Sequence, residues 1–151
     1  MKLLFKMFIS GRNKEGLSER EIQNCLWAWE FLLSGKNNIK LVTYEANQHN
    51  SRTRFSETKN VVYLGADVKP GNGIEANSRM SILACLAHEL SHAQRFELGF
   101  QRPIELPDVL IDEAETSLHA SFISVLSPKD RDDLIEDARD RLNQWLAHLK
   151  E

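Results

Sequence analysis

The residues best suited to chemistry in this 151-residue chain form the run His88-Glu89-Leu90-Ser91-His92, an HExxH pattern. In an α-helix, side chains four residues apart lie one turn above each other, so both imidazoles can reach one metal ion. Glu89 is rotated by ~100° from His88 and falls beside that ion. Its carboxylate could there hold and deprotonate a water. The pattern therefore predicts a metal-dependent hydrolytic site.

The residues around this pattern favour a functional site over a pair of core histidines. On a helical wheel, the apolar residues of the segment gather opposite the two histidines: Leu83, Leu86, Leu90 and Ala93. The histidine face otherwise carries small residues, among them Ser81 and Ala84. We expect the leucines to anchor the helix in the core and the histidines to face away from it. Cys85, one turn before His88, is expected as a buried structural thiol.

A third protein ligand must come from elsewhere, because two histidines and a water leave tetrahedral zinc one ligand short. Arg95 and Leu98 stand where a metzincin has a glycine and a histidine, so that arrangement is excluded. The next helical segment, LIDEAETSLHA, offers acidic side chains instead. The candidates are Glu113, Glu115 and, less favoured, Asp112.

The helical wheel distinguishes these candidates. Glu113 shares a face with small residues, which let two helices approach closely: Thr116, Ser117, Ala120 and Ser124. Glu115 borders a predicted apolar stripe made of Ile111, Ala114, Leu118, Phe122 and Val125. We therefore expect Glu113 as the third ligand, with Glu115 as the alternative.

Capping signals and hydrophobic periodicity predict the elements that must position these residues. Helices are expected over 18–34, from 77 or 78 to about 98, over 107–126 and from 127 to the end; strands are expected over 39–46 and 60–64. The polar stretch 47–59 indicates a loop or hairpin, and residues 3–9 fit a strand or a helix end equally well. This order predicts one α+β domain over 1–151 with a small sheet.

The composition of the chain bears on which classes of partner it binds and on the cellular compartment in which we expect it. Nineteen Lys and Arg against 22 Asp and Glu give a net charge of −3, which offers no global attraction to nucleic acid or to an anionic membrane. The chain has no run of about 18 apolar residues, and no cleavage site of a secretory signal follows its N-terminus. Cys25 and Cys85 are expected as free thiols. We therefore expect a cytoplasmic protein with no membrane or nucleic-acid partner.

The motifs also carry a family resemblance. HELSH followed by DEAETSLHA resembles the zinc metallopeptidases of the gluzincin type, in which a glutamate on the helix after HExxH completes the site, commonly as N/D-E-x-x-small. Asp112, Glu113 and Thr116 match that pattern. Ala120 and the run 126–128 are similar, more loosely, to the small ImmA/IrrE-type peptidases. The resemblance covers about residues 60 to 128.

This resemblance implies a zincin-like fold and a zinc-dependent endopeptidase that acts on a specific protein substrate. His88, His92 and Glu113 would hold one Zn²⁺ per chain, and Glu89 would be the general base and then the proton donor to the leaving amine. The strand over 60–64 would pair with an extended substrate. Four residues are candidates for stabilising the oxyanion: His119, His49, Tyr44 and Tyr63.

Two other function classes compete with this interpretation. A non-catalytic module could keep the zinc site and recognise a protein partner, although a purely structural site has no use for a base at Glu89. A deformylase-like hydrolase is disfavoured, because the chain has no accompanying glycine-cysteine motif to supply a thiolate ligand.

Overall fold

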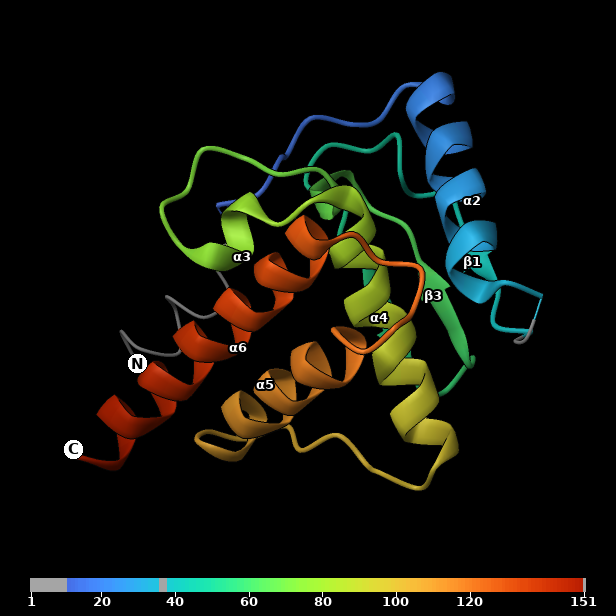
Figure 1. The fold of residues 1–151 in the computed structure, drawn as a ribbon. Helices are drawn as coiled ribbons and strands as arrows, with labels where there is room; N and C mark the ends of the chain where they lie inside the picture. The colour runs from blue at the N-terminus through green and yellow to red at the C-terminus, as the bar shows by residue number, and fades with distance from the viewer. Residues whose placement is uncertain (1–10, 36–37, 151) are drawn as a thin grey trace.

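The computed structural model describes residues 11–35 and 38–150, so the ambiguous segment 3–9 lies outside the described residues. Figure 1 shows the arrangement of the elements. In chain order they are α2 (Glu19–Leu33), β1 (Leu41–Val42), β2 (Arg54–Ser56), β3 (Val61–Tyr63), the 3-10 helix η1 (Ala66–Val68), α3 (Ala76–Arg79), α4 (Ile82–Glu97), α5 (Asp108–Ala120) and α6 (Pro128–Leu149). The predicted α+β class is confirmed.

Helix α2 begins and ends where its capping residues predict. The Ser18 hydroxyl accepts from the backbone of Glu21, and the Glu21 carboxylate accepts from the backbone of Ser18, which forms a capping box. Ser34 adopts the left-handed conformation that ends the helix. On the inner face, the indole of the buried Trp29 donates to the Ile39 carbonyl at 2.9 Å and ties α2 to the start of the sheet.

The described residues form one three-stranded sheet with the order β1-β3-β2. Strand β3 pairs in parallel with β1 and antiparallel with β2, so that Val62 lies between Leu41 and Phe55. The predicted strand over 60–64 is confirmed at its centre, whereas the one expected over 39–46 contains only two strand residues. Strand β2 lies in the stretch expected as a loop or hairpin. The sequence does not predict this strand, because its single apolar residue, Phe55, gives no alternation of apolar and polar residues.

The topology contradicts one expectation about the substrate. The strand over 60–64 was expected to pair with an extended substrate, but β3 is the central strand and both of its edges are already paired. A strand whose backbone groups are paired on both sides cannot accept a further strand. The edge strand close to α4 is β2.

The HExxH helix begins later than predicted. The chain is extended at Met80 between α3 and α4, and the Ser81 side chain caps α4 by accepting from the Ala84 amide at 3.0 Å. Two carboxylates of α6 hold this start. Asp133 accepts from the Ser81 amide at 3.0 Å, and Asp130 accepts from the Ser81 hydroxyl at 2.6 Å. The break depends on these long-range contacts, which the local sequence pattern does not contain.

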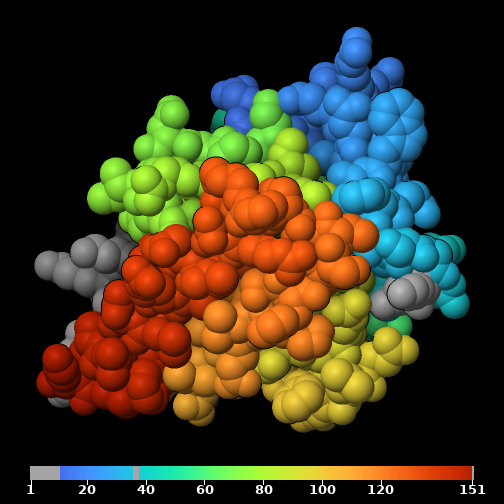
Figure 2. All heavy atoms as spheres, in the orientation of Figure 1, coloured from blue at the N-terminus to red at the C-terminus, as the bar shows by residue number. Residues whose placement is uncertain are grey.

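Helix α4 lies between the sheet and the pair α5–α6, and it contacts both (Figure 1). Its leucines Leu86 and Leu90 are buried in the hydrophobic core with Val62. In the space-filling view of Figure 2, α5, α6 and their connector cover much of α4 from this side. The helix thus has an apolar side toward the sheet and a second buried side toward α5.

Helix α5 ends at Ala120, earlier than the predicted boundary near residue 126. The guanidinium of Arg131 donates to the carbonyls of Ser121, Ser124 and Leu126, which holds the connector to α6 in a non-helical path. Helix α6 then begins at Pro128 with Ser127 as its N-cap, as predicted. Among the described residues, no helix is long and apolar enough to cross a membrane.

Replacing Ser127 tests how strongly this cap stabilises the fold. Ser127→Ala removes the hydroxyl that accepts from the Asp130 amide, so we expect the free energy of unfolding to fall by about 1 kcal/mol. Urea denaturation followed by circular dichroism measures this change. Ser124→Ala, which removes an exposed hydroxyl in the same connector, is the matched control. Equal losses in the two variants would contradict a specific capping role.

Candidate metal centre

Helices α4 and α5 bring the three predicted ligands together. The Nε2 atom of His88 lies 2.9 Å from Oε2 of Glu113, and the Nε2 atom of His92 lies 3.1 Å from Oε1 of the same carboxylate. One possible ligand atom from each residue lies within 4.8 Å of the others, and all three residues are buried. This group can hold a metal ion.

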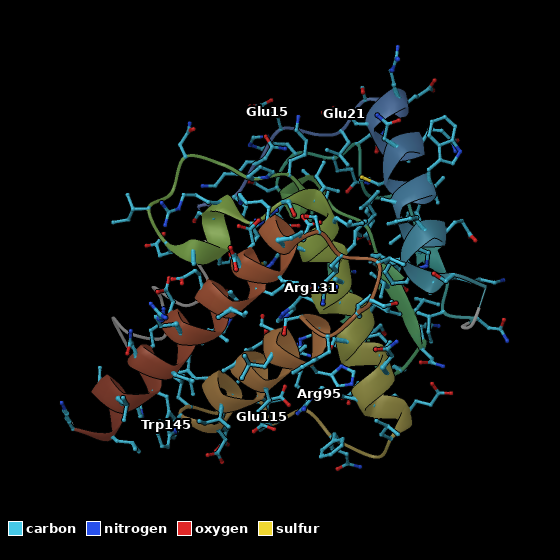
Figure 3. All side chains as sticks on the ribbon, in the orientation of Figure 1. Glu15, Glu21, Arg95, Glu115, Arg131 and Trp145 are labelled. Atoms are coloured by element: carbon cyan, nitrogen blue, oxygen red, sulfur yellow. The ribbon has the colours of Figure 1, made fainter. Side chains whose placement is uncertain are left out.

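Glu113 and Glu115 lie on different sides of α5. The Glu113 side chain is 7% exposed, whereas that of Glu115 is 52% exposed and pairs with Arg95 at 3.5 Å (Figure 3). The small face predicted around Glu113 is confirmed for Thr116, Ser117 and Ala120, which are all fully buried. It is wrong for Ser124, which is exposed and lies beyond the end of α5.

The predicted apolar stripe of α5 is confirmed only in part, since Ala114 is buried and Val125 packs against the core. The position of Glu115 beside this stripe does not bring its side chain into the core, because that side chain is 52% exposed. Phe122 is 82% exposed and lies beyond the end of the helix. Leu118 is also exposed. The face that packs against α4 and α6 is instead the one with Glu113 and the small residues, because these allow the helices to approach closely.

Two hydroxyl groups fix which ring nitrogen of each histidine carries a proton. Ser117 donates its only hydrogen to Asp137 at 2.5 Å, so it must accept from Nδ1 of His88, 2.8 Å away. Thr116 donates to the carbonyl of Asp112 at 2.7 Å, and its oxygen lies 3.4 Å from Nδ1 of His92. In the tautomer with its single proton on Nδ1, each ring presents the lone pair of Nε2 toward Glu113.

The three groups can accommodate a cation between the rings and the carboxylate. Burial raises the pKa of Glu113, but His92, Arg141 and, where the imidazoles carry a proton on Nε2, hydrogen bonds from both rings hold it well below its usual value, so the carboxylate is an acceptor. Two Nε2 lone pairs that face acceptor oxygens at 2.9 and 3.1 Å are satisfied only if a proton lies on each ring or a metal ion lies among them. One ion satisfies all three groups without placing two charged rings side by side in a buried site.

The two contacts with Glu113 are of hydrogen-bond length, and the three possible ligand atoms all lie within 4.8 Å of one another. Zinc bonds of ~2.0–2.2 Å to nitrogen and oxygen, in tetrahedral geometry, place neighbouring ligand atoms roughly 3.3 Å apart. The contacts of 2.9 and 3.1 Å between each Nε2 atom and Glu113 are slightly shorter.

Glu89 lies next to this group without belonging to it, as its rotation on the helix predicts. Its Oε1 atom accepts from the backbone amide of Phe55 on β2 at 3.2 Å. Burial raises the pKa of Glu89 to about 7, and the neighbouring Glu113 adds to this effect. A carboxyl group with such a pKa can both accept and return a proton near neutral pH.

A cavity of about 190 Å³ opens beside His92, the one candidate ligand that lines it. It lies between β2 with the residues that follow it, α4, the connector before α5 and the start of α5. The other residues that line it are Phe55, Glu57, Thr58, Arg95, Phe100, Arg102 and Asp112. Aromatic surface and charged groups therefore meet next to the candidate ligands.

Three residues that hold this site carry no signal of that role in the local sequence. Asp137 and Arg141 come from α6, and Arg141 donates to Asp137 at 2.9 Å while its Nη1 atom lies 3.7 Å from Glu113. Arg102, from the connector, donates to Oε1 of Glu113. The sequence places Asp137 and Arg141 four residues apart, which indicates an ion pair on one face of a helix. It does not indicate that this face packs against the candidate ligands.

The residues proposed for oxyanion stabilisation lie elsewhere. His119 pairs through Nδ1 with the Ser91 hydroxyl at 2.7 Å, and Tyr44 packs edge-on against Tyr63 with ring centroids 6.2 Å apart. Neither these three nor His49 contributes to the lining of the cavity. Cys85 is buried and free, as expected, and burial raises the pKa of its thiol to about 12.

Comparison of the chain with protein-family models, curated proteins and solved structures gives no match. The interpretation of the site therefore depends on its own geometry and chemistry.

The two glutamates of α5 allow a direct test of the ligand set. Glu113→Ala should weaken metal affinity by more than the ~10–100-fold expected for a supporting residue, because it removes one of the three converging groups. Glu115→Ala should leave the affinity within a few-fold of wild type, since that side chain points to solvent. Competition with a chelating dye measures both. Loss of metal in Glu115→Ala with retention in Glu113→Ala would contradict the assignment.

The hydroxyl behind His88 gives a second test. Ser117→Ala leaves Nδ1 of His88 and the carboxylate of Asp137 without the group that links them. Metal affinity should fall by ~10–100-fold, and dye competition again measures it. Ser121→Ala is the control, because its hydroxyl donates only to the Leu118 carbonyl in the same helix. Equal affinities in both variants would show that Ser117 does not orient His88.

Proposed function

We propose that the chain is a zinc-dependent endopeptidase with a zincin-like arrangement, which hydrolyses peptide bonds in a specific protein substrate. One observation carries the proposal. The Nε2 atoms of His88 and His92 converge on the buried Glu113, while Glu89 stays outside that group with a pKa of about 7. Three ligands and an adjacent base are the parts that metal-assisted hydrolysis needs.

The donor set supports zinc as the metal. Two imidazoles and one carboxylate are a ligand set of catalytic zinc sites and leave the fourth position for water or substrate. The same donor types also hold Fe(II) in oxygenases. Glu89 favours zinc chemistry, because hydrolysis requires a general base beside the open position. Zinc, when bound, would polarise the scissile carbonyl and lower the pKa of its water to ~7.

The residues of the chain would then handle the protons. Glu89 would take one proton from the attacking water and return it to the leaving amine. Ser117 and Asp137 keep the proton of His88 on Nδ1, so that Nε2 stays available as a ligand. These residues hold their positions through buried hydrogen bonds before any substrate arrives.

We place the extended substrate along β2 instead of β3. Strand β2 is an edge strand, contacts α4 and contributes Phe55 to the cavity beside His92. The amide of Phe55 bonds to Glu89, so this strand and the base are in direct contact. A peptide on β2 would therefore pass close to both the ligand group and the base.

The alternative function is a non-catalytic module that uses the metal for stability and recognises a protein partner. The hydrogen bond between Glu89 and the Phe55 amide favours it, because this bond gives Glu89 a structural task without catalysis. The two functions predict different effects of a Glu89 side chain that cannot accept a proton: an endopeptidase would lose its cleavage activity, whereas a binding module has no cleavage activity to lose.

Metal analysis and one substitution test the proposal. Elemental analysis of protein purified without added metal should find about one zinc per chain. Glu89→Gln should keep the fold and the zinc but slow cleavage of a proteome-derived peptide library, followed by mass spectrometry, by at least about 100-fold. Glu97→Gln, an exposed change on the same helix, is the control. Iron in place of zinc, or cleavage unchanged in Glu89→Gln, would overturn the proposal; zinc without any cleavage by wild type would favour the binding module.

A further inference from the structure

Arg102 occupies an unusual position next to the candidate ligands. It lies in the connector between α4 and α5, donates to Oε1 of Glu113 and lines the cavity beside His92. The same Oε1 atom is 3.1 Å from Nε2 of His92. Arg102 therefore binds the carboxylate oxygen that a metal ion between His92 and Glu113 would also contact.

The other two arginines near the site are held more firmly. Arg95 pairs with Asp112 at 3.1 Å and with Glu115 at 3.5 Å, and its guanidinium lies over the Phe100 ring. Arg141 is bonded to Asp137 at 2.9 Å, so it has a carboxylate partner besides Glu113. Among the described carboxylates, Arg102 pairs only with Glu113, and its side chain is 40% exposed.

A metal ion at Glu113 would weaken the attraction between this carboxylate and the guanidinium of Arg102. The ion takes up the negative charge of the carboxylate and repels the guanidinium, since two like charges lie a few ångströms apart. The exposed side chain of Arg102 can then turn into the adjacent cavity, where a ligand on the metal would lie. A guanidinium is a planar fork of donors that matches a carboxylate or another pair of anionic oxygens.

We propose that Arg102 binds an anionic oxygen of the ligand that occupies the cavity beside the metal. This inference rests on the proposed function and supplies the anion-binding group for which His119, His49, Tyr44 and Tyr63 are misplaced. Two sources share the required chemistry: a carboxylate of the substrate, and the oxyanion that develops at the carbonyl under attack. Arg102 would be exchanged between Glu113 in the metal-free protein and the ligand in the metal-loaded protein.

The test uses the full chain loaded with Co²⁺, whose visible spectrum reports on groups that bind near the metal. Metal affinity is measured first, and the loaded protein is then titrated with acetate, as a planar carboxylate, and with methylphosphonate, as a tetrahedral anion. In Arg102→Met, metal affinity should rise several-fold, because a nearby positive charge is removed. Affinity for at least one of the anions should fall by about 10-fold or more.

Two controls isolate the role of the guanidinium. Arg102→Lys keeps the charge, so its metal affinity should stay near wild type while anion binding is partly retained. Arg139→Met makes the same charge change at an exposed position on α6 and should alter neither quantity. The expected result for Arg102→Met is a rise in metal affinity together with a fall in anion affinity. If Arg102 only supported Glu113, its replacement would lower both affinities.

Each outcome decides the inference. A loss confined to acetate assigns Arg102 to a substrate carboxylate, and a loss confined to methylphosphonate assigns it to the oxyanion; both support anion binding. Unchanged anion affinity in Arg102→Met, a parallel fall in metal affinity, or a metal-loaded wild type that binds neither anion overturns the inference alone. A wild-type protein that takes up no metal overturns the proposed function as well.

Discussion

The structure depends on one buried carboxylate, that of Glu113, which the Nε2 atoms of two histidines face. Glu113 could not remain charged between α4 and α5 without cations around it, because burying an unpaired carboxylate is expensive. Arg102 and Arg141 reach its two oxygens from a connector and from α6. The site is therefore compensated in the metal-free protein, and the helices that carry it can pack before an ion binds.

Helix α6 holds this arrangement together although it contributes no candidate ligand. Its first turns bind the start of α4 through Asp130 and Asp133, and its middle turn supplies Asp137 to the hydrogen bond behind His88. The HExxH helix is thus fixed at its N-terminus and again at the ligand. Since these contacts come from one rigid helix, the orientation of the His88 ring is coupled to the position of the whole of α4.

The parts of the site that follow from local periodicity could be predicted from the sequence, and those that follow from long-range packing could not. The spacing of His88, Glu89 and His92 fixes their directions on any helix, and the small residues around Glu113 showed which face another helix could approach. The predicted stripe failed at Phe122 because the chain leaves the helix at Ala120, where Arg131 holds the connector. Strand β2 became visible only through its pairing with β3.

The two arginines at Glu113 differ in their other partners, and this difference determines which side chain a bound metal ion could displace. Arg141 has a second carboxylate partner, Asp137, and is mostly buried, so it keeps a carboxylate partner when an ion takes over the charge of Glu113. Arg102 has an open cavity beside it and loses its attraction to Glu113 at the same moment. Binding of an ion would therefore leave the scaffold of α6 intact and release a single cationic side chain at the mouth of the cavity. The charge that stabilises the metal-free site would thereby become available to a ligand only when the metal is present.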